Sequence, residues 1–190
     1  KKNKSISAIL YSHFLLQLFY AWMVIYMPIY LNQYIGFSWQ EIGVMFTIML
    51  LPFMLFELPL GRLADKKIGE KEILVTGFII MAISTFFIPT ISSHSVVVWS
   101  ILLFITRVGA SFVEVASESY FFKQVNEKNT GLISLFRMAR PLAYISAPAI
   151  VVCLIYFFNT QNTEYVYIFS ALAIPMFIGV IYGMKIKDTR

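Results

Sequence analysis

Six long apolar stretches, separated by short polar or turn-forming segments, dominate the chain. They are the runs Ile6–Leu31, Glu41–Leu60, Ile73–Ile91, Val96–Phe122, Thr130–Phe158 and Tyr165–Met184. An α-helix needs about 20 apolar residues to cross a bilayer, and none of the runs shows the strict alternation of a membrane β-strand. The pattern therefore predicts an all-α integral membrane protein with six transmembrane helices.

The composition agrees with that prediction. Of the 190 residues, 59% are hydrophobic and only 13% are charged, whereas soluble domains have about 45–50% apolar and about 25% charged residues. Six spans leave no length for a soluble domain. We therefore expect the chain to contact the lipid bilayer and to bind no nucleic acid. The one cysteine, Cys153, lies inside an apolar run, which excludes a disulfide framework and a cysteine-based metal site.

The cations are distributed unevenly along the chain. Most precede the first run, follow the sixth, or lie in the segments that join the second to the third and the fourth to the fifth run. The three alternate loops, near Asn32–Gln40, Ser92–Ser95 and Asn159–Glu164, contain no Lys or Arg. By the positive-inside rule, both termini and the two basic loops are cytoplasmic. We therefore expect a multi-pass protein of the plasma (inner) membrane with an even number of spans.

Charged side chains also occur inside the predicted spans, where insertion scales give a cost of about 2.5–3.5 kcal/mol for each. The fourth run carries one polar stripe at spacings i, i+4, i+7 and i+11, made of Arg107, Ser111, Glu114 and Glu118. Arg107 lies about 16 Å from the outer end of this helix, near the middle of the bilayer. The fifth run places Arg137 and Arg140 on one face, with Arg137 at about the depth of Glu114. An ion pair between the two helices is therefore geometrically allowed.

These charges have two interpretations. Glu114, Arg137 and Arg140 are candidates either for an ion pair that fixes the fourth and fifth helices or for a proton relay. Arg107 is the deepest charge and has no partner at its own level within its helix, so a functional role in the cavity is favoured. The other substrate or cavity candidates on this helix are Ser111 and Glu118.

The first run carries a milder polar stripe. Gln17 and Tyr20 on this stripe are further substrate or cavity candidates. His13 shares the stripe, but a lone histidine near a helix start is more often interfacial than a ligand. We therefore expect His13 at the membrane interface.

The distribution of polar residues repeats after three helices. The third and sixth runs contain no charged residue, the first and fourth carry the polar stripes, and the second and fifth are intermediate. Two prolines seven residues apart occur on both the second run (Pro52 and Pro59) and the fifth (Pro141 and Pro148). We therefore predict a three-plus-three inverted repeat, with residues 1–91 as the first repeat and 92–190 as the second.

The segment between the second and third runs is the most specific part of the sequence. It reads Gly-Arg-Leu-Ala-Asp-Lys-Lys-Ile-Gly-Glu-Lys over residues 61–71. It resembles the signature loop of the major facilitator superfamily, Gly-x-Leu-Ala-Asp-Arg-x-Gly-Arg-Lys. Here one extra residue separates Asp65 from Gly69, and Glu70 stands where the family prefers a cation.

This segment has two interpretations. A basic topogenic turn explains the cations but not the placement of Gly61 and Asp65. Gly61 would permit close helix approach, and Asp65 would accept hydrogen bonds or pair with a cation. We therefore favour a cytoplasmic gating latch, whose members are Gly61, Arg62, Asp65, Lys66 and Gly69.

The resemblance implies a fold and a function. A complete member of the family has two six-helix halves, and in each half the first and fourth helices line a central cavity. The chain is similar to one such half of a major facilitator fold, so its implied partner is the other six-helix half of the same transporter. The two departures of residues 61–71 from the signature and the initial Lys1 favour the carboxy-terminal half. The implied function is secondary active transport of a small solute by alternating access, with ion or proton coupling, and no substrate or coupling ion is identified.

Two other classes of function compete with transport. An intramembrane enzyme would need paired aspartates or a Gly-x-Ser-x-Gly or His-Glu-x-x-His motif, and the sequence offers only His13 and His94, so we expect no catalytic residue, metal ligand or cofactor. The sequence also contains no Gly-x-x-x-x-Gly-Lys loop for ATP hydrolysis. A non-transporting six-helix membrane scaffold or receptor is the better alternative, although it has little reason to keep a polar face on the fourth helix.

Overall fold

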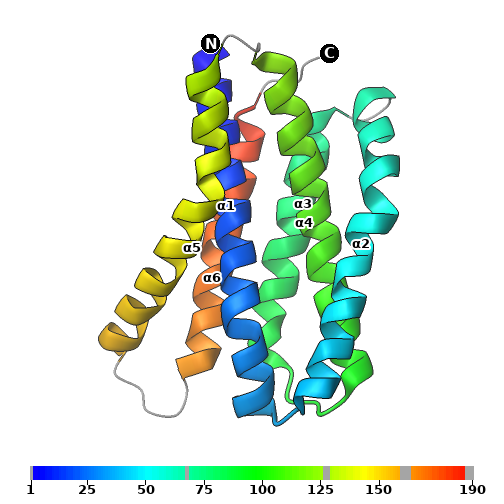
Figure 1. Cartoon of the computed structure of the whole chain (residues 1–190), viewed down its shortest axis with the longest axis vertical. Helices are drawn as coiled ribbons and strands as arrows, with labels where there is room; N and C mark the ends of the chain where they lie inside the picture. Colours follow the sequence, from blue (N-terminus) through cyan, green and yellow to red (C-terminus); the bar gives the residue numbers. More distant parts are fainter. Residues whose placement is uncertain (1, 67–68, 126–128, 159–163, 187–190) are drawn as a thin grey trace.

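A computed structural model of the chain shows a bundle of long helices (Figure 1). It describes residues 2–66, 69–125, 129–158 and 164–186, with the side chains in these ranges except those of residues 2–3, 57–58, 62–66, 158 and 164–167. The helices are α1 (Lys2–Ile29), α2 (Trp39–Lys66), α3 (Glu70–Phe87), α4 (Val96–Gln124), α5 (Thr130–Phe158) and α6 (Glu164–Met184). The all-α prediction is confirmed, and most expected helix ends are right to within a few residues.

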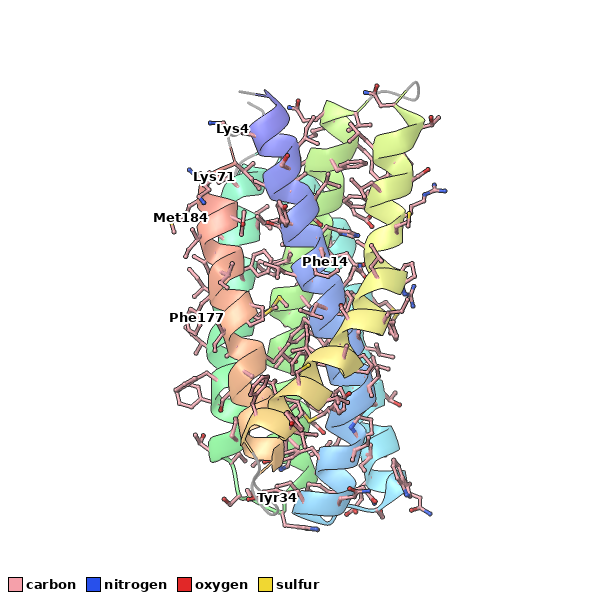
Figure 2. All side chains as sticks on the ribbon, turned by 90° about the vertical axis from the view of Figure 1, so that its left-hand side faces the viewer. Lys4, Phe14, Tyr34, Lys71, Phe177 and Met184 are labelled. Atoms are coloured by element: carbon pink, nitrogen blue, oxygen red, sulfur yellow. The ribbon has the colours of Figure 1, made fainter. Side chains whose placement is uncertain are left out.

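The helices are long and apolar enough for a membrane protein. Among the described residues, 5 helices, α1 to α5, have the length and hydropathy to cross a bilayer. The apolar part of α6 that qualifies, Ile168–Met184, is shorter. Large apolar side chains are exposed, among them Ile79 and Phe86 on α3 and Phe177 on α6. Figure 2 shows Phe177 on the outside of the bundle.

Local chemistry explains how the chain turns between α1 and α2. A wider π-helical turn, η1 (Tyr30–Ile35), follows α1 and ends at Gly36, which has a φ of 91° that side-chain-bearing residues rarely adopt. The carboxylate of Glu41 then accepts hydrogen bonds from the backbone N–H and the hydroxyl of Ser38, both 2.8 Å long. The Ser38 hydroxyl accepts one from the Glu41 N–H at 3.4 Å. This reciprocal capping box fixes the start of α2.

Two central helices organise the bundle. Helix α4 packs against α2 and α3, α1 packs against α5 and α6, and the pairs α1–α4 and α3–α6 are also in contact. Exchanging α1, α2 and α3 with α4, α5 and α6 leaves this set of pairs unchanged. A three-plus-three repeat would produce such a set, whereas the inverted repeat and its division after residue 91 stay predictions.

The ends of the helices place the basic residues together. The start of α1 and the end of α6 lie at the same end of the bundle as the junctions from α2 to α3 and from α4 to α5 (Figure 1). Figure 2 shows Lys4 and Lys71 at this end and Tyr34 at the other. An ion pair between Lys123 and the buried Glu70 also joins the end of α4 to the start of α3 here. We call this the basic end.

Glycines bring α3 into close contact with both of its neighbours. A Cβ added to Gly77 would lie 2.7 Å from the carbonyl oxygen of Gly109, and one added to Gly109 would lie 2.8 Å from that of Gly77. On α6, Gly179 and Gly183 are four residues apart and face α3, Gly179 against the ring of Phe78. Small residues at this spacing are typical of membrane helices whose backbones approach closely. Helices α3 and α4 thus pack backbone to backbone, and the glycines of α6 receive side chains of α3.

Helix α5 is bent. Two prolines, Pro141 and Pro148, lie inside it, and each lacks the N–H that would continue the helical hydrogen bonding. Figure 1 shows α5 following α1 near the basic end and leaning away from the bundle beyond it. The part of α5 after the prolines therefore leans outward, although α5 and α6 remain in contact.

The expected loop after the second run is partly wrong. Helix α2 continues beyond Leu60 through Lys66, so Gly61, Arg62, Asp65 and Lys66 are helical rather than part of a loop. Arg, Leu, Ala and Lys are good helix formers, and they outweigh the single glycine. Gly69 does lie in the connection, at the residue that caps the start of α3.

Candidate functional site

A cavity of about 550 Å³ lies between α1, α2, α4 and α5. Its polar wall comes from α1, α4 and α5 and consists of His13, Gln17, Tyr20, Arg107, Glu114, Glu118, Arg137, Arg140 and Tyr144. The structure therefore brings together the sequence candidates Gln17, Tyr20, Arg107 and Glu118 with the candidates for an ion pair or relay. Both signs of charge face the same space.

Arg107 is the most enclosed of these charges. Its side chain is 3% exposed, and its position places it near the middle of α4. The guanidinium carbon lies 5.0 Å from the ring centroid of Tyr20 and 5.7 Å from that of Phe19, both on α1. These cation–π contacts hold the guanidinium between α1 and α4. In the described part of the chain, its Nε atom has no hydrogen-bond partner.

Tyr20 also contacts the next charge along α4. Its hydroxyl donates a hydrogen bond of 2.8 Å to Oε2 of Glu114. The same side chain thus presents its ring to Arg107 and its hydroxyl to Glu114. Sequence reasoning placed Tyr20 in the cavity but did not predict this link, because the spacing along one helix says nothing about the rotation of its neighbour.

The two α5 arginines lie on the wall opposite. Arg137 and Arg140 are exposed, whereas Glu114 is half-buried. Arg137 and Glu114, which the sequence places at about the same depth, both line the cavity. Their ion pair stays a prediction.

The expectation for His13 is wrong. Its side chain is 5% exposed, its ring stacks on that of Phe136 with centroids 3.7 Å apart, and its Nδ1 lies 3.5 Å from the hydroxyl oxygen of Ser117. The error came from the helix start, because α1 begins at Lys2 rather than Ile6. His13 is therefore three turns inside the helix, where its position four residues before Gln17 was the better signal.

Ser111 lies apart from the main cavity. It lines a neighbouring pocket of about 250 Å³ between α2 and α4, together with Phe53, Glu114, Val115 and Glu118. Its hydroxyl donates a hydrogen bond of 2.8 Å to the carbonyl oxygen of Val108 in its own helix. Glu114 and Glu118 lie on the walls of both spaces, so the stripe predicted on the fourth helix divides between them.

The residues proposed for the gating latch are only partly described. The side chains of Arg62, Asp65 and Lys66 lie outside the described residues. No described atom lies within 4 Å of the position that a Cβ on Gly61 would occupy. The expectation that Gly61 permits close helix approach therefore stays a prediction, whereas close approaches of described helices occur at Gly77 and Gly109.

The apolar wall of the cavity was missed altogether. Helix α2 supplies most of it, through Phe46, Met49, Leu50 and Phe53. The spacing of Phe46, Met49 and Phe53 does mark one helical face. In a membrane helix, however, every face is apolar, so this spacing could not distinguish the cavity wall from the lipid side.

The hydrogen bond between Tyr20 and Glu114 allows a direct test. A hydrogen bond to a charged group contributes about 1.5–3 kcal/mol, so we expect Tyr20→Phe to lower the free energy of unfolding of the whole protein by that amount in detergent. In a Glu114→Ala background the same change should cost less than about 0.5 kcal/mol. Tyr26→Phe, on the same helix, is the matched control and should have little effect. If Tyr20→Phe lowers the free energy of unfolding equally with and without Glu114, the hydrogen bond does not stabilise the protein.

The long apolar helices and the charged residues in the cavity between them are those of an integral membrane protein. The sequence matches the family described as "Major Facilitator Superfamily" over residues 9–189. Because the match covers nearly the whole chain, the protein belongs to the Major Facilitator Superfamily. A comparison with curated proteins finds no match.

Solved structures show the same fold. One of them, from a work on "substrate recognition in proton dependent oligopeptide transporters", superimposes with a TM-score of 0.82 at 13% sequence identity. The match covers 98% of this chain and 42% of that chain. The chain therefore spans less than half the length of the protein that it matches.

Proposed function

We propose that this chain is one six-helix half of a secondary active transporter, which moves a small solute by alternating access. Membership of the family and the share of the solved structure that it covers support this proposal. The other six-helix half would close the cavity from the opposite side. The carboxy-terminal half is favoured by the loosened signature between Asp65 and Gly69.

The single observation that carries the proposal is the burial of Arg107 in the wall of the cavity. A buried cation near the middle of a membrane helix is costly and usually marks a solute pathway. Arg107 is 3% exposed, lines the 550 Å³ cavity, and has a guanidinium nitrogen without a hydrogen-bond partner among the described residues. Binding sites of such transporters lie near the bilayer midplane. We infer that this guanidinium binds an anionic group of the solute.

Ion coupling is assigned to the carboxylates on the same helix. Glu114 and Glu118 line the cavity on the side of Arg107 that leads toward the basic end. A carboxylate beside a cavity can take up and release a proton as the solute binds and leaves. We propose Glu114 as the carrier because its hydrogen bond to Tyr20 links it to the ring that packs on Arg107.

The proposed orientation follows from the charges. The basic end would face the cytoplasm, with both termini there, in a plasma (inner) membrane. The opposite end, which contains Ser92–Ser95, would then face outward.

Alternating access can be tested without knowledge of the substrate. Val24 is exposed and lines the cavity, so we expect Val24→Cys, in a whole protein that lacks Cys153, to react with a membrane-impermeant maleimide from either side of the membrane in vesicles of both orientations. Phe177→Cys, on the lipid side, is the control that should not react. Ser93→Cys reports orientation and should react from the outside only.

The outcomes separate the two classes of function. Reaction of Val24→Cys from one side only would contradict alternating access and favour a scaffold or receptor. Reaction of Ser93→Cys from the cytoplasmic side only would overturn the orientation.

A further inference from the structure

A second pocket, separate from the central cavity, lies between α1 and α6 at the basic end. It has a volume of about 540 Å³ and is lined by Lys4, Ser7, Ala8, Tyr11, Tyr182 and Lys185. It shares no lining residue with the central cavity. Figure 2 shows the start of α1, marked by Lys4, beside the end of α6, marked by Met184. The pocket is therefore on the outside of the bundle, at the level where the helices leave the apolar region.

The charged side chains that line this pocket, among the described residues, are of one sign. Lys4 on α1 and Lys185 in the turn after α6 are both exposed and line the pocket. Nζ of Lys185 lies 5.0 Å from the ring centroid of Tyr182, a cation–π contact that holds this ammonium over the pocket wall. Two ammonium groups that converge on one space suit an anion with several acceptor oxygens.

The floor of the pocket is aromatic. The rings of Tyr11 and Tyr182 stack with centroids 5.2 Å apart and an angle of 29° between their planes. Tyr11 is 56% exposed. Tyrosines with an apolar ring and a polar hydroxyl are typical of the boundary between acyl chains and headgroups. The pocket thus combines cationic groups with aromatic rings, as a site for a lipid headgroup and the glycerol region beside it would.

The side of α6 below the pocket would accommodate acyl chains. Ile178, four residues before Tyr182, and Ile181, four residues before Lys185, are both exposed there, and Ile174 is exposed one turn further on. A free anion would leave this surface unused, whereas a phospholipid would cover it. The continuity of the cationic pocket with an exposed apolar stripe therefore favours a lipid over a soluble anion.

From these observations we infer that the pocket between α1 and α6 binds the phosphate headgroup of an anionic phospholipid. Lys4 and Lys185 contact the phosphate oxygens, Tyr11 and Tyr182 support the glycerol region, and the acyl chains lie along α6. Basic pockets between membrane helices are a general means of binding anionic headgroups. The inference concerns a surface outside the central cavity and does not depend on the proposed transport function.

Native mass spectrometry of the purified whole protein in detergent tests the inference. The probes are dioleoylphosphatidylglycerol, which is anionic, and dioleoylphosphatidylcholine, which is not. We expect the anionic lipid to be retained in preference, and we expect its apparent affinity to fall about fivefold for each of Lys4→Gln and Lys185→Gln. Lys71→Gln is the matched control: it removes a cation from the same end that does not line the pocket, and it should change the affinity less than twofold, about the limit set by long-range attraction alone.

Three results would overturn the inference. Equal retention of the two lipids by the wild-type protein would show that the pocket does not select for charge. If Lys71→Gln and Lys4→Gln lower the affinity for the anionic lipid equally, the lipid is attracted by the overall charge of this end and not by a specific site. Displacement of the lipid by an excess of inorganic phosphate would show that the pocket takes a soluble anion. The lipid comparison uses the wild-type protein, so it stands even if a variant is unstable.

Discussion

Replacing Arg107 by alanine is expected to reduce solute uptake about 10- to 100-fold. A hydrogen bond to a charged group contributes about 1.5–3 kcal/mol, and about 1.4 kcal/mol corresponds to a factor of ten. The measurement is uptake by the whole protein in proteoliposomes, with the solute that the wild-type protein takes up fastest from a panel of carboxylates, amino acids and dipeptides. Arg107→Lys keeps the charge but loses the planar set of donors, so its uptake should be intermediate.

The stability of Arg107→Ala should change much less than its activity. The lost cation–π contacts with Phe19 and Tyr20 are worth about 0.5–2 kcal/mol, and removal of a buried charge offsets part of that loss. Lys71→Ala is the control, because Lys71 is a cation that does not line the cavity. Normal uptake by Arg107→Ala, or a loss of uptake that is no larger than that of Lys71→Ala, would contradict the assignment of Arg107 to the solute.

Replacing Gly77 by alanine is expected to destabilise the bundle strongly. The added methyl group would lie 2.7 Å from the carbonyl oxygen of Gly109 and 2.8 Å from side-chain carbons of Phe112 and Val113. A backbone oxygen in a packed helix cannot rotate away, so α3 and α4 would have to separate. Such overpacking costs about 1–3 kcal/mol, and we expect the upper end of that range in the free energy of unfolding. Gly109→Ala should behave in the same way.

The control for this prediction is a glycine in open space. Nothing lies within 4 Å of a Cβ built on Gly43 in α2, so Gly43→Ala should stabilise the protein by about 0.5–1 kcal/mol through its better helix propensity. Thermal and denaturant unfolding of the whole protein in detergent provide the comparison. A Gly77→Ala protein as stable as Gly43→Ala would show that the close approach of α3 and α4 is not a determinant of stability.

The helices could be predicted from the sequence because their signal is local. A run such as Val96–Phe122 is apolar along its whole length, and the observed helix Val96–Gln124 differs from it by two residues at one end. The end of α2 could not be placed in the same way. Residues 61–66 include a glycine and three charged residues, which suggests a loop. The arginine, leucine, alanine and lysine among them are nevertheless good helix formers, and the helix continues beyond the apolar region.

The site was predictable only as far as each helix could be considered alone. The stripe on the fourth helix correctly placed Arg107, Glu114 and Glu118 on one side, because the helical repeat fixes their directions. The partners of these side chains depend on how far α1 is rotated and shifted against α4. Neither the Tyr20 hydrogen bond nor the stacking of His13 on Phe136 could therefore be read from spacing.

The two prolines of α5, like the two prolines of α2, give the helix a mechanical role. Tyr144, on the cavity wall, lies between Pro141 and Pro148, where missing hydrogen bonds make the helix softer in bending. Helices α3 and α4, by contrast, contain no proline and pack closely at Gly77 and Gly109, so we expect them to move little against each other. A force on the outer part of α5 would turn it about this hinge and move Tyr144 toward or away from α4. We therefore expect the width of the cavity to change by bending of α5 while α3 and α4 stay packed together.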